Sequence, residues 1–218
     1  TPEVGDFWYN NEIQAYTADS TNIFISNGKL VLQAMESPDH VKTVRDYISA
    51  RIITHGKKRF KNGRIDVKAK VPYGQGLWPA IWMMPETNKY GAWPRSGEID
   101  ILEVIGYELD VVHKACHFGS NLDRHSRGRG YYHSNDLSED FHVYSLIKEK
   151  DNLWWYFDSI PMLHVSKDLL APHHYPFNEE FYLIMNIAVG GGWPGYPDET
   201  TKFPQTMEVE YVRLYEKE

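Results

Sequence analysis

The sequence predicts an all-β fold, a sandwich or a barrel, and three observations support this class. Roughly ten or more short runs rich in Val, Ile, Tyr, Phe and Trp are separated by turn residues. Several runs alternate apolar with polar residues, as half-buried strands do, and no segment has a convincing helical apolar period. The 218 residues are 42% hydrophobic, enough for one sizeable core. We therefore expect a single domain over residues 1–218.

The N-terminal half contains the first predicted strands. Residues 1–24 mix aromatic with polar side chains and are predicted to be loop with short strand pieces. The Asn-Gly pair at 27–28 joins two apolar runs, which is a strong hairpin signal. A charged loop is predicted over 35–47. Strands are predicted in this half at 23–26, 29–34, 48–54, 63–71, 77–85 and 98–104.

The C-terminal half continues the pattern of strands and turns. Residues 120–138 are polar, basic and glycine-containing, and are predicted to form a long surface loop. Residues 166–180 are rich in Pro and His and should contain at most one helical turn. The most apolar run, 181–189, is expected to be a central strand. The remaining strands are predicted at 111–118, 141–148, 153–158, 164–165 and 207–215.

Composition excludes several classes of partner. A net charge of −7 argues against a nucleic-acid backbone as a partner, and no apolar run reaches the length of about 18 residues that a membrane span needs.

Cys116 is the only cysteine, so no intrachain disulfide can form. His113 and His117 share one face of a predicted strand, but no ligand cluster lies nearby and a zinc site is not expected. The first residues do not resemble a signal peptide, as in a mature or trimmed chain.

A short acidic strand at 97–104 gives the first indication of chemistry. Its apolar residues favour a pleated, half-buried backbone, which places Glu98 and Asp100 on one face. Glu103 is five positions after Glu98, so a regular strand would turn it to the opposite face. One extra residue, a β-bulge, would bring Glu103 back beside the other two acids.

Three neighbouring carboxyls on one surface suit glycoside hydrolysis, which needs one protonated and one ionised carboxyl. Ionisation of one acid raises the pKa of its neighbour, so a shared site separates the two roles. A carboxyl separation of about 5 Å gives retention of configuration, and one of roughly 6.5–9.5 Å gives inversion. The sequence leaves this distance open, although the compactness of one strand favours retention.

Four tryptophans are candidate stacking platforms for sugar rings, because aromatic side chains present a large flat face. Trp78 and Trp82 share one face of a predicted strand, although a core position is the commoner role for such residues. Trp93 lies a few residues before the acidic strand. Trp193 lies in a glycine-rich loop at 190–195, whose backbone can turn sharply and present the ring at a cleft edge.

Taken together, these motifs have a recognisable counterpart. The stretch 97–103 resembles the signature of the family-16 glycoside hydrolases, in the bulged form with an extra residue before the second Glu. The resemblance runs from about Asn10 to Tyr215, with the motifs in matching order. Further segments are similar to the laminarinase (endo-β-1,3-glucanase) branch of that family, at 76–85, 90–94, 117–119 and 190–195.

The resemblance implies a β-jelly-roll sandwich of the concanavalin type, with a concave glycan cleft and a retaining endo-mechanism. By matching positions, Glu98 would be the nucleophile and Glu103 the general acid/base, and Asp100 would assist by hydrogen bonding and charge balance. The expected substrate is β-1,3-glucan, with mixed β-1,3-1,4-glucan as an extension, and no cofactor is required for catalysis. Substrate contacts are implied at Asn11, Arg51, Trp78, Trp82, Trp93, His117 and Trp193.

Two departures from the family pattern stand out. Family members usually begin with an extra strand carrying an Asp-Glu-Phe stretch, and this chain starts after that point, so a sheet edge would be missing or supplied otherwise. Many members also hold a structural calcium between the N-terminal region and an Asp in the last strand. Glu210 occupies that last-strand position here, and the N-terminal ligand has no evident match.

Two alternatives to a β-1,3-glucanase remain open at this point. The same machinery could hydrolyse another polysaccharide, such as a galactan, although the laminarinase-like loops count against this. The chain could also be a non-catalytic β-glucan-binding protein, but such proteins typically lose the catalytic acids, and all three are present here. We expect a monomer that is secreted or extracellular, with neither nucleic acid nor membrane as a partner.

Overall fold

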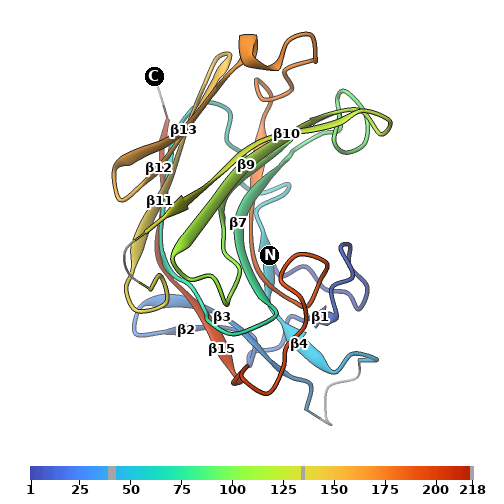
Figure 1. Ribbon diagram of the computed structural model, residues 1–218, viewed down its shortest axis with the longest axis vertical. Helices are drawn as coiled ribbons and strands as arrows, with labels where there is room; N and C mark the ends of the chain where they lie inside the picture. Colours follow the sequence, from blue (N-terminus) through green and yellow to red (C-terminus); the bar gives the residue numbers. More distant parts are fainter. Residues whose placement is uncertain (39–42, 134–135, 217–218) are drawn as a thin grey trace.

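Two β-sheets pack face to face around one hydrophobic core (Figure 1). A computed structural model describes residues 1–38, 43–133 and 136–216 of the chain. Residues 39–42 and 134–135, which belong to two of the predicted loops, lie outside the described residues. The predicted all-β sandwich is confirmed.

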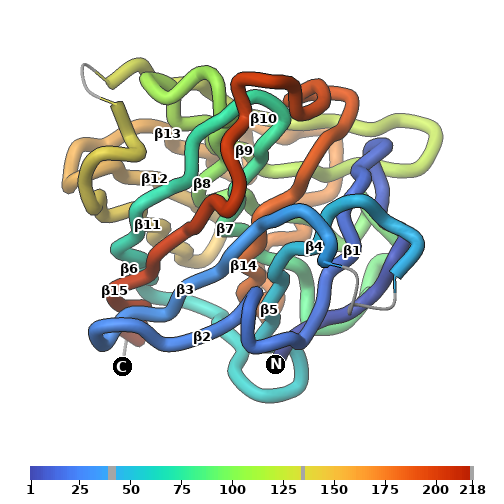
Figure 2. The backbone as a smooth tube through the Cα atoms, turned by 90° about the horizontal axis from the view of Figure 1, so that it is seen from below, coloured from blue at the N-terminus to red at the C-terminus, as the bar shows by residue number. Residues whose placement is uncertain are grey.

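The larger sheet has nine strands and follows an order far from that of the sequence. The last strand of the chain lies between β3 and β6, as the red tube shows in Figure 2. β2 (Ile23–Ser26) pairs with β3 as the predicted hairpin. The path runs through β1 (Gln14–Tyr16), β4 (Tyr47–Ser49), β3 (Lys29–Glu36), β15 (Gln205–Glu216), β6 (Gly63–Lys70), β11 (His142–Glu149), β12 (Asn152–Phe157) and β13 (Ile160–Ser166).

The smaller sheet has six strands and contains the acidic strand near its middle. In order, these are β10 (Arg124–Tyr132), β9 (Val111–Gly119), β8 (Glu98–Glu103), β7 (Leu77–Pro85), β14 (Phe181–Val189) and β5 (Arg51–Ile53). A single 3-10 turn, η1 (Lys167–Leu170), follows β13, in agreement with the expected helical turn. Within the described residues, no helix has the length and hydropathy to cross a membrane.

The core forms where apolar residues of both sheets meet, and strand periodicity explains which residues reach it. Ile65, Val67 and Ala69 alternate along β6 and are at most 1% exposed. Ile99 of β8, in the smaller sheet, and Trp155 of β12, in the larger sheet, belong to the same core cluster and are fully buried. Burial of each large apolar side chain contributes about 1.5–3 kcal/mol, so this layer fixes how the sheets pack.

The strand predicted at 48–54 divides into two strands that belong to different sheets. β4 pairs with β3 in the larger sheet, and β5 pairs with β14 in the smaller one. Ala50 lies between them and is fully buried. β14, which was expected to be central, is an inner strand between β7 and the short edge strand β5.

The prediction of a long surface loop over 120–138 is wrong, because Arg124–Tyr132 forms β10. This strand pairs along its whole length with β9, as the long green and yellow pair in Figure 1 shows. It is an edge strand whose nine residues are all Arg, His, Ser, Gly or Tyr. Six of them are exposed and three are half-buried, so the strand lacks apolar alternation. Backbone hydrogen bonds rather than side-chain burial hold it, and that cause leaves little trace in a sequence.

Gly63 at the start of β6 is a position where only glycine fits. Its φ is +126°, and an added Cβ would lie 2.0 Å from the carbonyl oxygen of Tyr215. We expect Gly63→Ala to lower the free energy of unfolding by about 3 kcal/mol or more, measured by chemical denaturation. Gly28→Ala is the matched control: its φ is +75° with no atom within 4 Å of the added Cβ, so only about 1 kcal/mol of backbone strain is expected. Equal losses in the two variants would contradict the steric argument.

Candidate active site

A β-bulge in β8 brings the three acids to one face. Asp100 pairs with Ala115 and Glu103 pairs with His113, so three steps on β8 (100 to 103) correspond to two on β9 (115 to 113). The register to β7 shifts at the same place. Glu98, Asp100 and Glu103 all line one cleft. The bulge that strand parity predicted is therefore confirmed.

The bulge is held from the opposite sheet. Ile101 and Leu102, which contain the extra residue, are both buried in the core. A bulge leaves a backbone group without its ladder partner. The indole N–H of Trp155, on β12, donates to the carbonyl oxygen of Asp100 at 2.8 Å in a buried position. Trp155 was not predicted as a functional residue. The signal available in the sequence was the alternation of its strand, which places Trp155 on the inward face.

The three acids lie in a cleft of about 1170 Å³ on the smaller sheet. Strands β7, β8, β9, β10 and β14 line most of it, and the N-terminal residues 8–10 and 12, with the loops that contain 92–93 and 193, contribute to its walls. The cleft lies on the sheet that contains the acids, as the resemblance implied for a concave glycan-binding surface. Of the predicted substrate contacts, six line this cleft: Arg51, Trp78, Trp82, Trp93, His117 and Trp193.

The seventh predicted contact, Asn11, does not line the cleft. It is exposed, and its neighbours Asn10 and Glu12 line the cleft in its place. Asn10 and Asn11 both have positive φ, at 61° and 62°, so the chain turns tightly there. The turn directs adjacent side chains differently, which residue type alone could not indicate.

The acids make a small number of direct contacts. The indole N–H of Trp78 donates to Oε1 of Glu103 at 3.2 Å. His117 Nε2 lies 3.1 Å from Oδ2 of Asp100 and 3.9 Å from Oε1 of Glu98. Asp100 is almost fully buried, whereas the Glu98 side chain remains 19% exposed. Glu98 is thus more accessible from the cleft than Asp100.

A second network of hydrogen bonds holds the cleft side chains beside β7 in place. The indole N–H of Trp82 donates to Oδ1 of Asn186 at 2.7 Å, and the Asn186 amide donates to the hydroxyl of Tyr16 at 3.0 Å. The Arg51 guanidinium lies 4.9 Å from the Trp82 ring centroid and pairs with Glu3. Asn186 was missed from the sequence, because a lone polar residue in an apolar run gives no sign of the partners it meets.

Two tryptophans stand at the rim of the cleft. Trp193 is 41% exposed and packs edge-on against Trp78, with ring centroids 5.4 Å apart, and against His113 at 4.9 Å. Trp93 is 36% exposed and lies under the Arg124 guanidinium at 5.0 Å. Their exposed faces are available for stacking on sugar rings.

Burial raises the pKa values of all three acids, and repulsion from neighbouring carboxylates adds to the shift of Glu98 and Glu103. Burial raises the pKa of Asp100 to about 7. Burial and then the charge of Asp100 raise the pKa of Glu98 to about 8, while His117 opposes the shift. Burial, followed by the charges of Asp100 and Glu98, raises the pKa of Glu103 well above its usual range. The charges of both neighbours thus favour the protonated form of Glu103, which suits a general acid.

Asp100→Asn is expected to move the basic limb of the kcat/KM pH profile to lower pH by about one unit. The charge of Asp100 raises the pKa of Glu103, so its removal lets Glu103 lose the catalytic proton at lower pH. Asparagine keeps the size of the buried side chain. The measurement is the pH dependence of kcat/KM on a soluble glucan.

Trp78→Phe is the control of opposite sign. The Trp78 hydrogen bond lowers the pKa of Glu103, and phenylalanine removes the donor while keeping an aromatic face. The basic limb should then move to higher pH. Shifts of both variants in the same direction would contradict the assignment of that limb to Glu103.

Glu210, the candidate calcium ligand, lies outside the cleft on β15. Its carboxylate pairs with Lys68 Nζ at 2.8 Å and its side chain is 43% exposed. Calcium prefers several carboxylate and carbonyl oxygens. No group of three metal-ligating side chains in the described part of the chain includes Glu210. The calcium site stays a prediction.

The cleft itself contains one group of side chains that could hold a cation. Glu98, Asp100 and His117 offer ligand atoms within 4.8 Å of one another. An ion there would occupy the carboxylate that the proposed chemistry needs free. The group is more consistent with a proton-sharing cluster.

Comparison with known proteins places the chain in a class defined by this fold and site. Residues 10–213 match the family described as Glycosyl hydrolases family 16. The chain belongs to this family, and the resemblance noted in the sequence is confirmed.

Particular relatives match nearly the whole chain. The chain is 39% identical to a beta-glucanase of Rhodothermus marinus, over 97% of this chain and 76% of the relative. It is 38% identical to glucan endo-1,3-beta-glucosidase A1 of Niallia circulans, over 97% of this chain and only 33% of that longer protein. The structure of the laminarinase catalytic domain from Thermotoga maritima MSB8 superimposes with a TM-score of 0.92 at 39% identity, covering 100% of this chain and 91% of that one.

Proposed function

We propose that this chain is an endo-acting hydrolase of β-1,3-glucan, of the laminarin type, that also accepts mixed β-1,3-1,4-glucan. The relatives named above are glucanases and laminarinases at 38–39% identity across nearly the whole chain. The single observation that carries the proposal is the bulge at 101–102, which places Glu98, Asp100 and Glu103 together in a cleft edged by tryptophans.

The proposed reaction is a double displacement with retention of configuration. Glu98 attacks the anomeric carbon, the glycosidic C–O bond breaks, and Glu103 donates its proton to the departing oxygen. Glu103, now ionised, then takes a proton from water, whose oxygen displaces Glu98 from the same carbon. One water is consumed and both glutamates return to their starting protonation states.

In this scheme, Asp100 balances the charge of the neighbouring Glu98. It neighbours Glu98, and burial raises the pKa of both carboxyls, so this pair holds a proton more readily than either acid would in water. When Asp100 carries the proton, Glu98 is the free nucleophile. When Glu98 forms the glycosyl ester its own charge is lost, and Asp100, whose Oδ2 lies 3.1 Å from His117 Nε2, keeps its proton until the second step frees Glu98.

The rim tryptophans support recognition of a polymer. Trp193 and Trp93 expose aromatic faces at the cleft, and the acids lie between β7 and β9 on its floor. A chain of sugars can stack on such faces while its internal linkage lies over the acids. This arrangement suits attack within a polymer.

The activity test uses purified chain on laminarin, lichenan and agarose, with reducing ends and product size measured together. We expect laminarin to fall rapidly in size at low reducing-end release, lichenan to be cut more slowly, and agarose to remain intact. The matched control is a Glu98→Gln, Glu103→Gln double variant, which should bind laminarin without cleaving it. Preferential cleavage of agarose would support the galactan alternative. Binding of laminarin with no reducing ends from any polymer would support the non-catalytic alternative.

We further propose that the chain acts as a secreted monomer without a dissociable cofactor. A polysaccharide substrate is too large to enter cells, and three carboxyls supply both the nucleophile and the proton donor. Size-exclusion chromatography with light scattering tests the monomer, and unchanged activity after chelation tests the independence from metal.

A further inference from the structure

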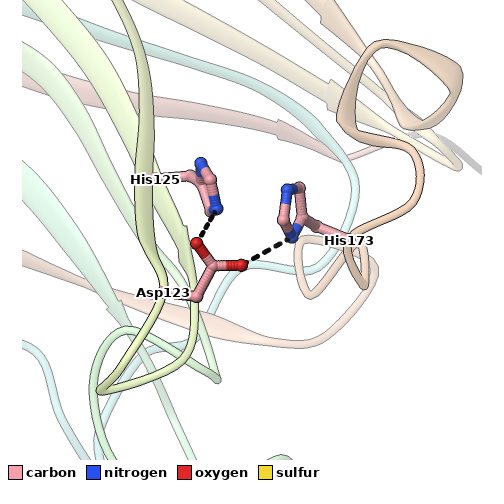
Figure 3. A group of neighbouring side chains, drawn as sticks. All are labelled: Asp123, His125 and His173. Atoms are coloured by element: carbon pink, nitrogen blue, oxygen red, sulfur yellow. Dashed lines mark hydrogen bonds and ion pairs between the residues drawn. The ribbon is translucent and has the colours of Figure 1, made fainter.

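We propose that Asp123, His125 and His173 form a binding site for a borderline transition-metal ion such as Zn²⁺, away from the catalytic cleft. The three side chains come from two segments that are distant in sequence and converge on one point (Figure 3). Asp123 and His125 lie at the start of β10, and His173 lies in the turn after η1. None of them takes part in the chemistry proposed for the cleft.

The side chains point away from the cleft because of strand parity in the β9–β10 hairpin. His125 pairs with Phe118, which is buried in the core, whereas the next residue, Ser126, pairs with the cleft residue His117. Arg124, on the cleft side, is directed over Trp93. The cluster therefore lies on the opposite face of the hairpin from the substrate.

The ligand atoms already lie close to the spacing that a metal requires. His125 Nε2 is 2.7 Å from Oδ1 of Asp123, and His173 Nδ1 is 3.7 Å from Oδ2 of Asp123. Ligand atoms of the three residues lie within 4.8 Å of one another. Tetrahedral zinc with bonds of about 2.0–2.1 Å places its ligand atoms roughly 3.3 Å apart, between the two measured separations. Small side-chain rotations would complete the site.

The two imidazoles are held in place before any ion arrives. Their ring centroids are 3.8 Å apart. Phe118 packs against both rings, at 5.6 Å from His125 and 5.8 Å from His173. The Asp123 side chain is 63% exposed, which leaves room for water at a fourth coordination position. A rigid pair of nitrogens with one adjustable carboxylate is a suitable arrangement for binding.

The donor atoms select the class of ion. Imidazole nitrogen suits zinc, copper and nickel, whereas calcium and magnesium prefer oxygen ligands throughout. In the metal-free chain, Asp123 accepts a hydrogen bond in the position that an ion would take beside His125. Binding would replace that imidazole proton with the metal and clamp the hairpin to the segment after η1.

Two other groups in the described residues have comparable ligands but are already committed. Glu98, Asp100 and His117 belong to the cleft. In the group of His133, His142 and Asp158, the two carboxylate oxygens of Asp158 contact His142 Nδ1 and the Val143 N–H, at 2.7 and 2.8 Å. In the proposed site, by contrast, the two carboxylate oxygens of Asp123 face the imidazole nitrogens of His125 and His173, which belong to the cluster itself.

The test is calorimetric titration of the chelator-treated chain with zinc chloride, repeated for three variants. We expect one ion per chain with a Kd below about 100 μM. His125→Gln, His173→Gln and Asp123→Asn should each weaken binding by about tenfold or more. With zinc at about 100 times Kd, the Tm of the parent chain should rise by about 5–10 °C, and this rise should disappear in the variants.

His164→Gln is the matched control, since His164 is an exposed histidine of β13 outside the cluster, and its zinc affinity should equal that of the parent. Circular dichroism of each variant without zinc verifies that it is folded, and the exposed Asp123→Asn preserves a test if a histidine variant fails to fold. The proposal is overturned if the parent binds no zinc up to about 1 mM. It is also overturned if binding survives unchanged in folded His125→Gln, His173→Gln and Asp123→Asn.

Discussion

Replacing Glu98 by alanine is expected to lower kcat on laminarin by at least about 10⁴-fold, because the first displacement then lacks its attacking carboxylate. The cleft should still bind substrate, since Trp78, Trp93 and Trp193 are unchanged. Asp100 is a poor replacement for Glu98, because its shorter side chain is only 3% exposed. The effect should therefore appear in kcat, with KM little altered.

Azide distinguishes loss of the nucleophile from general damage to the site. Alanine leaves space on the nucleophile side of the cleft, where a small anion can attack the anomeric carbon directly. With an activated aryl β-laminaribioside as substrate, Glu98→Ala should form the α-glycosyl azide by a single displacement with inversion. Glu199→Ala, at an exposed loop position, is the control and should keep parental kcat and KM.

Replacing Glu103 by alanine should lower kcat on natural glucan by about 10²–10⁴-fold, because the departing sugar oxygen no longer receives a proton. An aryl leaving group of low pKa needs no such help, so the glycosyl-enzyme should still form from an activated substrate and then accumulate. The second step lacks its base and stays slow. A burst of aryl alcohol followed by a slow phase is the expected time course.

Azide should rescue the second step in Glu103→Ala, because an anion needs no general base. The product should be the β-glycosyl azide, since two inversions at one carbon give net retention. The two variants thus predict azides of opposite configuration. A β-azide from Glu98→Ala with an α-azide from Glu103→Ala would reverse the assigned roles.

The acidic strand shows how far sequence reasoning can reach. Alternation along a strand is a geometric rule, so the five-position gap between Glu98 and Glu103 required an extra residue if both acids face the cleft. The register of β8 confirms this. The tryptophans were identifiable because they flank the acids in the chain or lie in a glycine-rich loop, and the four of them line the cleft.

The parts that sequence reasoning missed depend on contacts between distant segments. Trp155 supports the bulge from the other sheet, 55 residues away in sequence. Asn186 on β14 joins Trp82 on β7 to Tyr16 on β1, a strand of the other sheet. β10 is held by backbone pairing to β9, which polar edge residues do not reveal. Each of these features follows from which strands become neighbours, and local periodicity contains no information about that.

The most direct test of the central claim is to identify the residue that becomes covalently glycosylated. Glu103→Ala would be incubated with the activated laminaribioside, quenched in acid and digested, and its peptides examined by mass spectrometry. We predict an added disaccharide mass on the peptide that contains 97–104, with fragmentation placing it on Glu98. A disaccharide on Asp100, or no covalent adduct despite a burst of aryl alcohol, would contradict the account.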